Sequence, residues 1–194
     1  EPHQIDEIMD ILTDSLDAGW QLNLPAVAGQ VLSAWDSRGS QQHTQHDALL
    51  RPLAVREAVA GEAARVVERM TYAGPDVPAH NQCGRLIRHD DPAGTLHLRD
   101  YGLDGTALAE QRQFLASLEP PDWPLSLAHR DDLLEPGPGF TSRQTHIATG
   151  QLHNQTDAMD HLRSFTYTRA GQLKSASLRL VGAGQVPHLL VSAL

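Results

Sequence analysis

Two adjacent acidic residues, Asp90 and Asp91, precede Pro92 and Gly94 and are of a type that could perform chemistry. A pair of carboxyl groups that shares one proton can act as an aspartyl acid and base. Adjacent residues of a strand point to opposite faces, so these two groups would not converge. Asp close to Pro and Gly commonly accepts hydrogen bonds from turn amides, and we therefore interpret the pair as turn residues.

Eleven histidines raise the possibility of a metal site. His43 and His46 are three residues apart, and His89 and His97 are eight apart. No His-Glu-x-x-His motif or acidic triad accompanies them, although a zinc site would need such a ligand set. We therefore predict no metal and no cofactor.

Nucleophilic catalysis is also poorly supported by the sequence. Cys83 lies near His80 and His89, but nothing specifies oxyanion donors or a third, orienting residue. A packed strand cysteine is the simpler interpretation. The serines lack the G-x-S-x-G pattern of a nucleophile elbow, and the chain is predicted not to be an enzyme.

The charge of the chain excludes several classes of partner. The formal net charge is −9, and the 15 basic residues are scattered, whereas phosphate binding needs a concentrated basic surface. No window approaches eighteen consecutive apolar residues. We predict no nucleic-acid partner and no membrane insertion. The chain begins Glu1-Pro2-His3, without an initiator Met or a visible signal peptide, and is expected to be a fragment or a processed protein.

The elements that would position these residues follow a repeated glycine. Gly84, Gly94 and Gly105 are separated by 94−84 = 10 and 105−94 = 11 residues. Glycine allows positive φ in a turn, and an Asp side chain before it can accept hydrogen bonds from turn amides. Related units end at Gly39, Gly150 and Gly171, and an aromatic residue or His precedes several of the glycines. The pattern predicts short strands joined by tight turns.

A low aromatic content of 5%, with 15 Gly and 12 Pro, favours a turn-rich β fold. Residues 56–70 are rich in helix formers, but the spacing of the glycines predicts two strands around a turn at Gly61. A period of about 21 residues, halved, is typical of stacked antiparallel hairpins.

Two segments differ from this pattern. Residues 3–18 carry Ile and Leu side chains at spacings of three and four, which predicts a short amphipathic helix within a first segment, 1–19. Residues 20–194 form the predicted β segment. It contains a Pro-rich insertion at about 119–139, and Trp123 is expected to tuck this insertion onto the sheet.

Five blocks of the sequence together resemble the tyrosine-aspartate (YD) repeats of the RHS family. They are Trp35-Asp-Ser-Arg-Gly39, His46-Asp-Ala-Leu-Leu-Arg-Pro-Leu53, Asn81-Gln-Cys-Gly-Arg-Leu86, His89-Asp-Asp-Pro-Ala-Gly94 and Tyr167-Thr-Arg-Ala-Gly-Gln-Leu173. Trp or His replaces the repeat tyrosine in three of them, and Leu50 stands at one glycine position. The order of blocks is most similar to the RHS shell of Tc insecticidal toxin C components. The turn residues assigned by the resemblance are Trp35, Asp36, Gly39, His46, Asp47, Gly84, His89, Asp90, Gly94, Gly105, Gly150, Tyr167 and Gly171.

The resemblance implies a mainly β strip of a spiral sheet that closes into a hollow shell. The expected function is a non-enzymatic segment of a secreted bacterial toxin that encloses a toxic C-terminal segment. Its expected partners are the remainder of the shell, a B-type toxin component and the enclosed segment. The alternative is a surface module that binds a carbohydrate or receptor through Trp20, Trp35 and Trp123.

Overall fold

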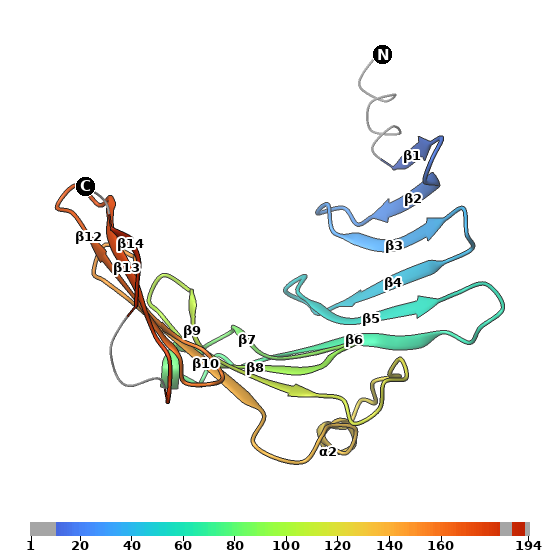
Figure 1. Cartoon of the computed structure of the whole chain (residues 1–194). Helices are drawn as coiled ribbons and strands as arrows, with labels where there is room; N and C mark the ends of the chain where they lie inside the picture. Colours follow the sequence, from blue (N-terminus) through green and yellow to red (C-terminus); the bar gives the residue numbers. More distant parts are fainter. Residues whose placement is uncertain (1–10, 183–187, 193–194) are drawn as a thin grey trace. The chain divides into compact units, whose positions relative to one another are not determined.

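The computed structural model describes residues 11–182 and 188–192, which form one antiparallel sheet of 14 strands (Figure 1). Every strand pairs with its neighbours in sequence, in the order β1 to β14. The strands are β1 (Leu12–Ser15), β2 (Gly19–Pro25), β3 (Val31–Asp36), β4 (Gln41–His46), β5 (Pro52–Ala58), β6 (Arg65–Tyr72), β7 (Leu86–Asp91), β8 (Gly94–Tyr101), β9 (Ala107–Phe114), β10 (Phe140–His146), β11 (Leu152–Thr156), β12 (Leu162–Tyr167), β13 (Leu173–Arg179) and β14 (His188–Ser192). The predicted mainly β class with antiparallel hairpins is confirmed.

In the part of the chain that the structure describes, helical structure is limited to two short elements, the 3-10 turn η1 (Ala79–Asn81) and the helix α2 (Leu127–Asp131). Among residues 11–182 and 188–192, no helix has the length and apolar character needed to cross a membrane.

The chain divides into two compact units. The first consists of Glu1–Thr71, His89–Gly94 and Leu115–Leu134. The second consists of Tyr72–Arg88, Thr95–Phe114 and Glu135–Leu194.

One type of hairpin turn recurs in both units. The residue that opens the turn, position i, donates its N–H to the carbonyl of residue i+4. Its own carbonyl accepts the N–H of residue i+3, which has positive φ. Two hydrogen bonds around one left-handed residue produce a tight turn followed by a bulge. The seven left-handed residues of these turns are Gly29, Gly39, Leu50, Gly105, Gly150, Asp160 and Gly171.

Left-handed residues follow the same spacing in the two units. One series in the first unit contains residues 29, 39, 50 and 61, and one series in the second contains 150, 160, 171 and 182, so both series have intervals of 10, 11 and 11. A constant offset of 121 residues also relates β2 to β10, β4 to β12 and β5 to β13, whose bounds match at both ends. The same series of hairpins therefore occurs once in each unit.

The ambiguous segment 56–70 forms the predicted pair of strands. β5 and β6 are antiparallel, and Gly61 has φ of 86° in the turn between them. Pairing in the sheet prevails over helix propensity here. Val66 lies inside β6, where a β-branched side chain fits well.

The prediction of an amphipathic helix over residues 3–18 is wrong for residues 11–18, the part of this segment that the structure describes. Residues 3–10 lie outside the described residues, but Leu12–Ser15 forms strand β1, which pairs with β2. Thr13 and Ser15 are weak helix formers, and β2 offers unpaired backbone groups to this short segment. A spacing of three or four between a few apolar residues does not outweigh that pairing.

Candidate functional sites in the turns and the insertion

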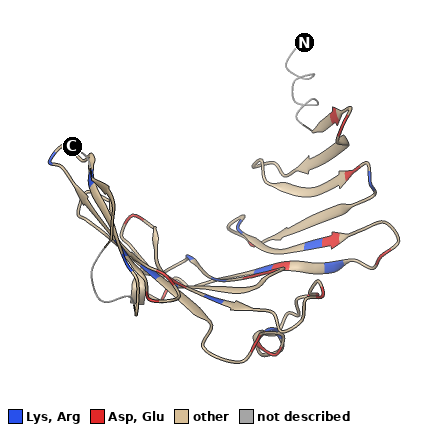
Figure 2. Ribbon diagram, viewed as in Figure 1, with Lys and Arg blue, Asp and Glu red and all other residues tan. Residues whose placement is uncertain are grey.

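Asp side chains hold several of the hairpin turns. Asp36 Oδ1 accepts hydrogen bonds from the N–H groups of Arg38 and Ser40, both at 2.9 Å. Asp47 Oδ1 accepts from Leu49 at 2.8 Å and from Arg51 at 2.9 Å. One carboxylate thus binds two turn amides that the ladder leaves unpaired. Trp35 and His46 are the last or next-to-last residues of the strands that lead into these turns, and Figure 2 shows acidic residues at several turns of the first unit.

The glycine position of the second of these turns carries leucine in the same backbone conformation. Leu50 has φ of 62°, and its N–H donates to the Asp47 carbonyl at 3.0 Å. Gly39, at the corresponding position of the preceding turn, has φ of 80°. A side chain with a Cβ is strained in this region, so the Leu50 turn forms at a cost that the glycine turns avoid.

We predict that Leu50→Gly stabilises the chain by about 0.5–1 kcal/mol. The substitution removes the strain of a non-glycine residue in the left-handed conformation, which costs about 1–2 kcal/mol. Against this gain, glycine loses more backbone entropy on folding, which costs up to about 0.5–1 kcal/mol. Leu50 is 50% exposed, so little burial is lost. Denaturation in urea measures the effect. The matched control is Leu49→Gly, at an exposed neighbour without positive φ, which should destabilise; an equal gain from both variants would refute the strain.

Hydrogen bonds in the turns lower the pKa of three carboxyl groups. The Arg51 N–H lowers the pKa of Asp47, and the Thr106 N–H lowers that of Asp104. For Asp157, burial acts to raise the pKa, but hydrogen bonds from the His161 and Met159 amides bring it below its ordinary value. The ionised form is the one that the turns stabilise.

These lowered pKa values predict a loss of stability in acid. A group whose pKa is lower in the folded chain stabilises it above the unfolded pKa, about 3.9 for Asp, and loses that effect as the pH falls through the folded pKa. We expect the free energy of unfolding to fall below about pH 4, and Asp47→Asn to flatten this dependence. Thr168, at the corresponding turn of the second unit, binds the Gln172 N–H through its hydroxyl at 3.2 Å. Thr168→Asn should leave the pH profile unchanged, and an unchanged profile for Asp47→Asn would contradict the prediction.

The predicted glycines occupy three kinds of position. Gly105, Gly150 and Gly171 are the left-handed residues of hairpin turns. Gly84 follows η1 and precedes β7, with φ of 68°. Gly94 is the first residue of β8.

The tyrosine of the repeat makes the same contact in two places. The Tyr167 hydroxyl donates to the Leu152 carbonyl at 2.7 Å, and the Tyr101 hydroxyl donates to the Leu86 carbonyl at 2.6 Å. In each case the tyrosine ends one strand and the acceptor begins the preceding strand. Tyr101 lies within the second unit, like Tyr167, and the sequence interpretation did not single it out.

The turn assignment was wrong for Asp90 and for His89, because both lie inside β7. The loop after β7 contains only Pro92 and Ala93, so the strand continues through Asp91. Asp91 Oδ1 accepts the Ala93 N–H at 2.9 Å and holds this turn. His89 Nε2 lies 2.9 Å from the Glu68 carboxylate.

Asp90 is fully buried and pairs with an arginine of the insertion. Arg130 Nη1 lies 2.5 Å from Asp90 Oδ2, and Arg130 is only 5% exposed. Its Nη2 donates to the Leu125 carbonyl at 3.3 Å. The ion pair fixes α2 on the sheet within the first unit. Sequence reasoning missed Arg130, since no pattern links residues 40 positions apart.

Trp123 anchors the insertion, as predicted. Its side chain is 1% exposed and packs in a cluster with Ala54, Val66 and Leu134. The Trp123 N–H donates to the Val66 carbonyl at 2.8 Å, and Asp122 accepts the Val66 N–H at 2.8 Å. The segment therefore pairs with β6 while its indole fills the core. Burial removes Trp123 from any sugar-stacking platform.

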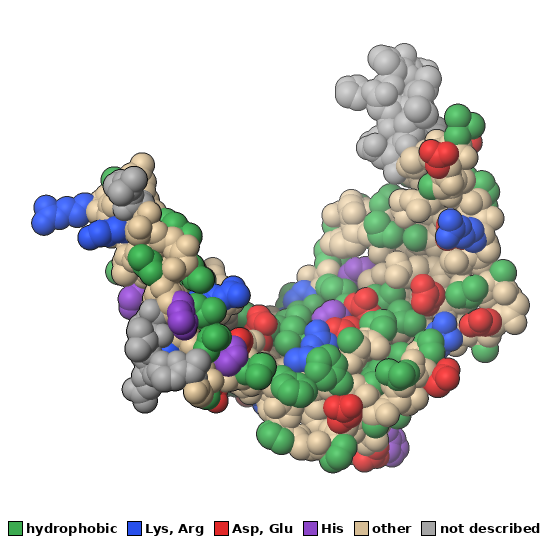
Figure 3. Space-filling model, in the orientation of Figure 1, with side chains coloured by type: hydrophobic (Ala, Val, Ile, Leu, Met, Phe, Trp, Pro, Cys, Tyr) green, Lys and Arg blue, Asp and Glu red, His purple; other side chains and the backbone are tan. Residues whose placement is uncertain are grey.

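The remaining candidate side chains are engaged in local contacts. Cys83 is exposed, and its thiol lies 3.0 Å from the Pro75 carbonyl. His43 Nδ1 lies 3.0 Å from the Ser33 hydroxyl. Within residues 11–182 and 188–192, no group of three His, Cys, Asp or Glu side chains is arranged to hold a metal ion. On the visible face of the first unit, hydrophobic side chains alternate with acidic and basic ones (Figure 3).

Comparison with known proteins relates this geometry to toxin subunits. No family model matches the sequence. The chain is 28% identical over 193 residues to toxin subunit YenC2 of Yersinia entomophaga, a match that covers 89% of this chain and 20% of that protein.

Solved structures show the same fold. The crystal structure of TcdB2-TccC3 is 31% identical with a TM-score of 0.84, and that of TcdB2-TccC3-Cdc42 is 30% identical with a TM-score of 0.85. A Photorhabdus luminescens Tc holotoxin pore with a mutated TccC3 is 31% identical with a TM-score of 0.85. Each match covers 95% of this chain and 9% of the other, so this chain corresponds to a small part of those molecules. With its recurrent turns, the chain is a β-sheet segment that resembles the RHS-repeat shell region of Tc toxin C components.

Proposed function

We propose that this chain is a non-enzymatic wall segment of a secreted bacterial toxin shell that encloses a toxic C-terminal segment. The observation that carries the proposal is the match of 95% of the chain, at a TM-score of 0.84, to part of TcdB2-TccC3. Nearly the whole of this sheet has the same fold as one part of a known toxin assembly. The best explanation is that it forms the same part of a similar assembly.

The use of the polar side chains supports a structural role. Asp36 and Asp47 bind turn amides, and Asp90 is neutralised by Arg130 in a buried pair. Tyr101 and Tyr167 bind backbone carbonyls of preceding strands. These groups contribute to holding hairpins in register, and this use leaves them unsuited to acid-base catalysis.

The ends of the strand order supply the contacts to partners. β1 and β14 are the first and last strands, so each has one side without a strand in the described residues. Unpaired strand edges accept further strands. We propose that the rest of the shell pairs there, and that a B-type component completes the enclosure.

A chimera tests the proposal. The matched region of the TcdB2-TccC3 chain is replaced by this chain, and digestion of the C-terminal segment of the product by added protease is measured. We expect the chimera to elute at the size of the parent and to protect the segment. A chimera of parental size whose segment is cut as fast as the free segment would refute the enclosure. A second chimera with Trp123→Ala, which loosens the insertion, should lose protection at a lower urea concentration.

A further inference from the structure

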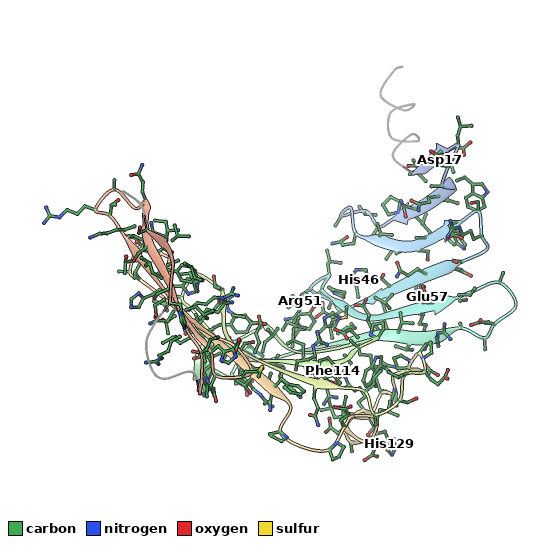
Figure 4. The ribbon with its side chains drawn as sticks, viewed as in Figure 1. Asp17, His46, Arg51, Glu57, Phe114 and His129 are labelled. Atoms are coloured by element: carbon green, nitrogen blue, oxygen red, sulfur yellow. The ribbon has the colours of Figure 1, made fainter. Side chains whose placement is uncertain are left out.

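Polar side chains form a row across four strands of the first unit. Asn23 on β2 lies directly opposite Ala34 on β3, Ala34 lies opposite Gln42 on β4, and Gln42 lies opposite Glu57 on β5. Directly opposite residues of antiparallel strands share one face, with Cβ atoms about 4.5–5.5 Å apart. Gln21 and Asp36 form the adjacent pair on the same face. Glu57 is labelled on its strand in Figure 4.

The small side chain of Ala34 makes this row concave. A depression of about 220 Å³ lies over it. The residues that line it are Gln21, Asn23, Ala34, Trp35, Asp36, Ser40, Gln41, Gln42 and Glu57. We call it the Ala34 depression.

The side chains around the Ala34 depression have free hydrogen-bonding capacity. Within residues 11–182 and 188–192, the side chains of Gln21, Asn23, Gln42 and Glu57 make no hydrogen bond or ion pair. Asp36 is oriented by the Arg38 and Ser40 amides, which bind its Oδ1 atom. Three amides and two carboxylates therefore surround an alanine floor with donors and acceptors available to a ligand.

The second unit shows that the repeat does not require this arrangement. At the offset of 121 residues, Ala34 corresponds to Gln155 and Glu57 corresponds to Leu178. Gln144, which corresponds to Asn23, donates its side-chain amide to the Ala107 carbonyl. The depression beside Gln144 and Gln155 is only about 100 Å³. The larger depression with unpaired amides is thus particular to the first unit.

We propose that the Ala34 depression binds a neutral carbohydrate. Sugar hydroxyls donate and accept hydrogen bonds, as the amides do, and carboxylates accept bonds from pairs of hydroxyls. The two carboxylates repel phosphate, sulfate and other anions. The depression is open and shallow, which suits one or two rings of an oligosaccharide.

The experiment uses the purified chain and a panel of neutral oligosaccharides: chitotetraose, cellotetraose, mannotetraose and galactotetraose. Binding is followed by saturation-transfer NMR and titration. We expect at least one member to bind with a dissociation constant between about 0.1 and 5 mM, typical of a few exposed hydrogen bonds. Ala34→Gln, which installs the residue of the second unit, should weaken binding at least about tenfold by filling the floor, and Gln42→Ala about threefold or more.

The matched control is Gln45→Ala. Gln45 is on the same strand as Gln42 but lies opposite Ala54 on the other face, so its removal should leave binding unchanged. Circular dichroism and urea denaturation establish that each variant is folded. The proposal is overturned if no oligosaccharide binds at a concentration tenfold above the highest expected dissociation constant. It is also overturned if Ala34→Gln and Gln42→Ala bind as tightly as the parent. Binding of an extended peptide in the depression, without binding of the sugars, would overturn it as well.

Discussion

Trp123→Ala is expected to lower the free energy of unfolding by about 3–5 kcal/mol, the range for a large aromatic side chain removed from a core. The indole is the largest fully buried side chain and contacts β5 and β6 through Ala54 and Val66. Its loss leaves a cavity that the backbone cannot close, because Asp122 and the Trp123 amide still bind Val66. Urea denaturation followed by circular dichroism measures the change.

The matched control for this variant is Trp20→Ala. Trp20 is 42% exposed on β2, so its truncation removes less buried area and should cost about 1–2 kcal/mol. Equal losses for the two variants would show that Trp123 does not anchor the insertion.

Arg130→Met is expected to destabilise the chain by about 3–5 kcal/mol, because it removes the guanidinium that lies 2.5 Å from the buried Asp90 carboxylate. Asp90 is 0% exposed, so water cannot replace the guanidinium. The double variant Arg130→Met/Asp90→Leu should cost less than the sum of the two single variants, because neither partner of the pair then leaves the other's charge buried. Denaturation of the two single variants and the double variant gives the coupling energy.

An exposed ion pair provides the comparison for Arg130. Arg51 Nη2 lies 2.7 Å from Asp47 Oδ2 at a turn, where both side chains are partly exposed. Arg51→Met should therefore cost about 1 kcal/mol or less. If Arg130→Met were equally mild, the buried pair would not hold α2 to the sheet.

The hairpins were predictable because glycine reports backbone conformation directly. The intervals between Gly84, Gly94 and Gly105 place positive φ where turns occur, and all three residues have it. The spacing also identified the turn at Gly61 against the helix propensity of residues 56–70. Leu50 was assigned to a glycine position from its place in the block His46–Leu53, and it adopts the glycine conformation.

Other features could not be predicted because they depend on contacts between distant residues. Asp90 and Asp91 look equivalent in sequence, but the two-residue loop after Asp91 sends one to the turn and the other to the buried face. The partner of Asp90 lies in the insertion, whose path over β6 is set by Trp123. The polar row around Ala34 becomes visible only when the register of β2–β5 is known.

The sequential order of the strands has a consequence for synthesis of the chain. Each new hairpin needs only the strand made just before it, so the sheet can grow while the chain leaves the ribosome. At about 5–20 residues per second, one strand and turn would be added every second or so. Trp123 breaks this order, because its partner Val66 is made 57 residues earlier (123−66 = 57). The core between β5, β6 and the insertion therefore stays incomplete until the insertion has been synthesised and Trp123 packs against the two strands.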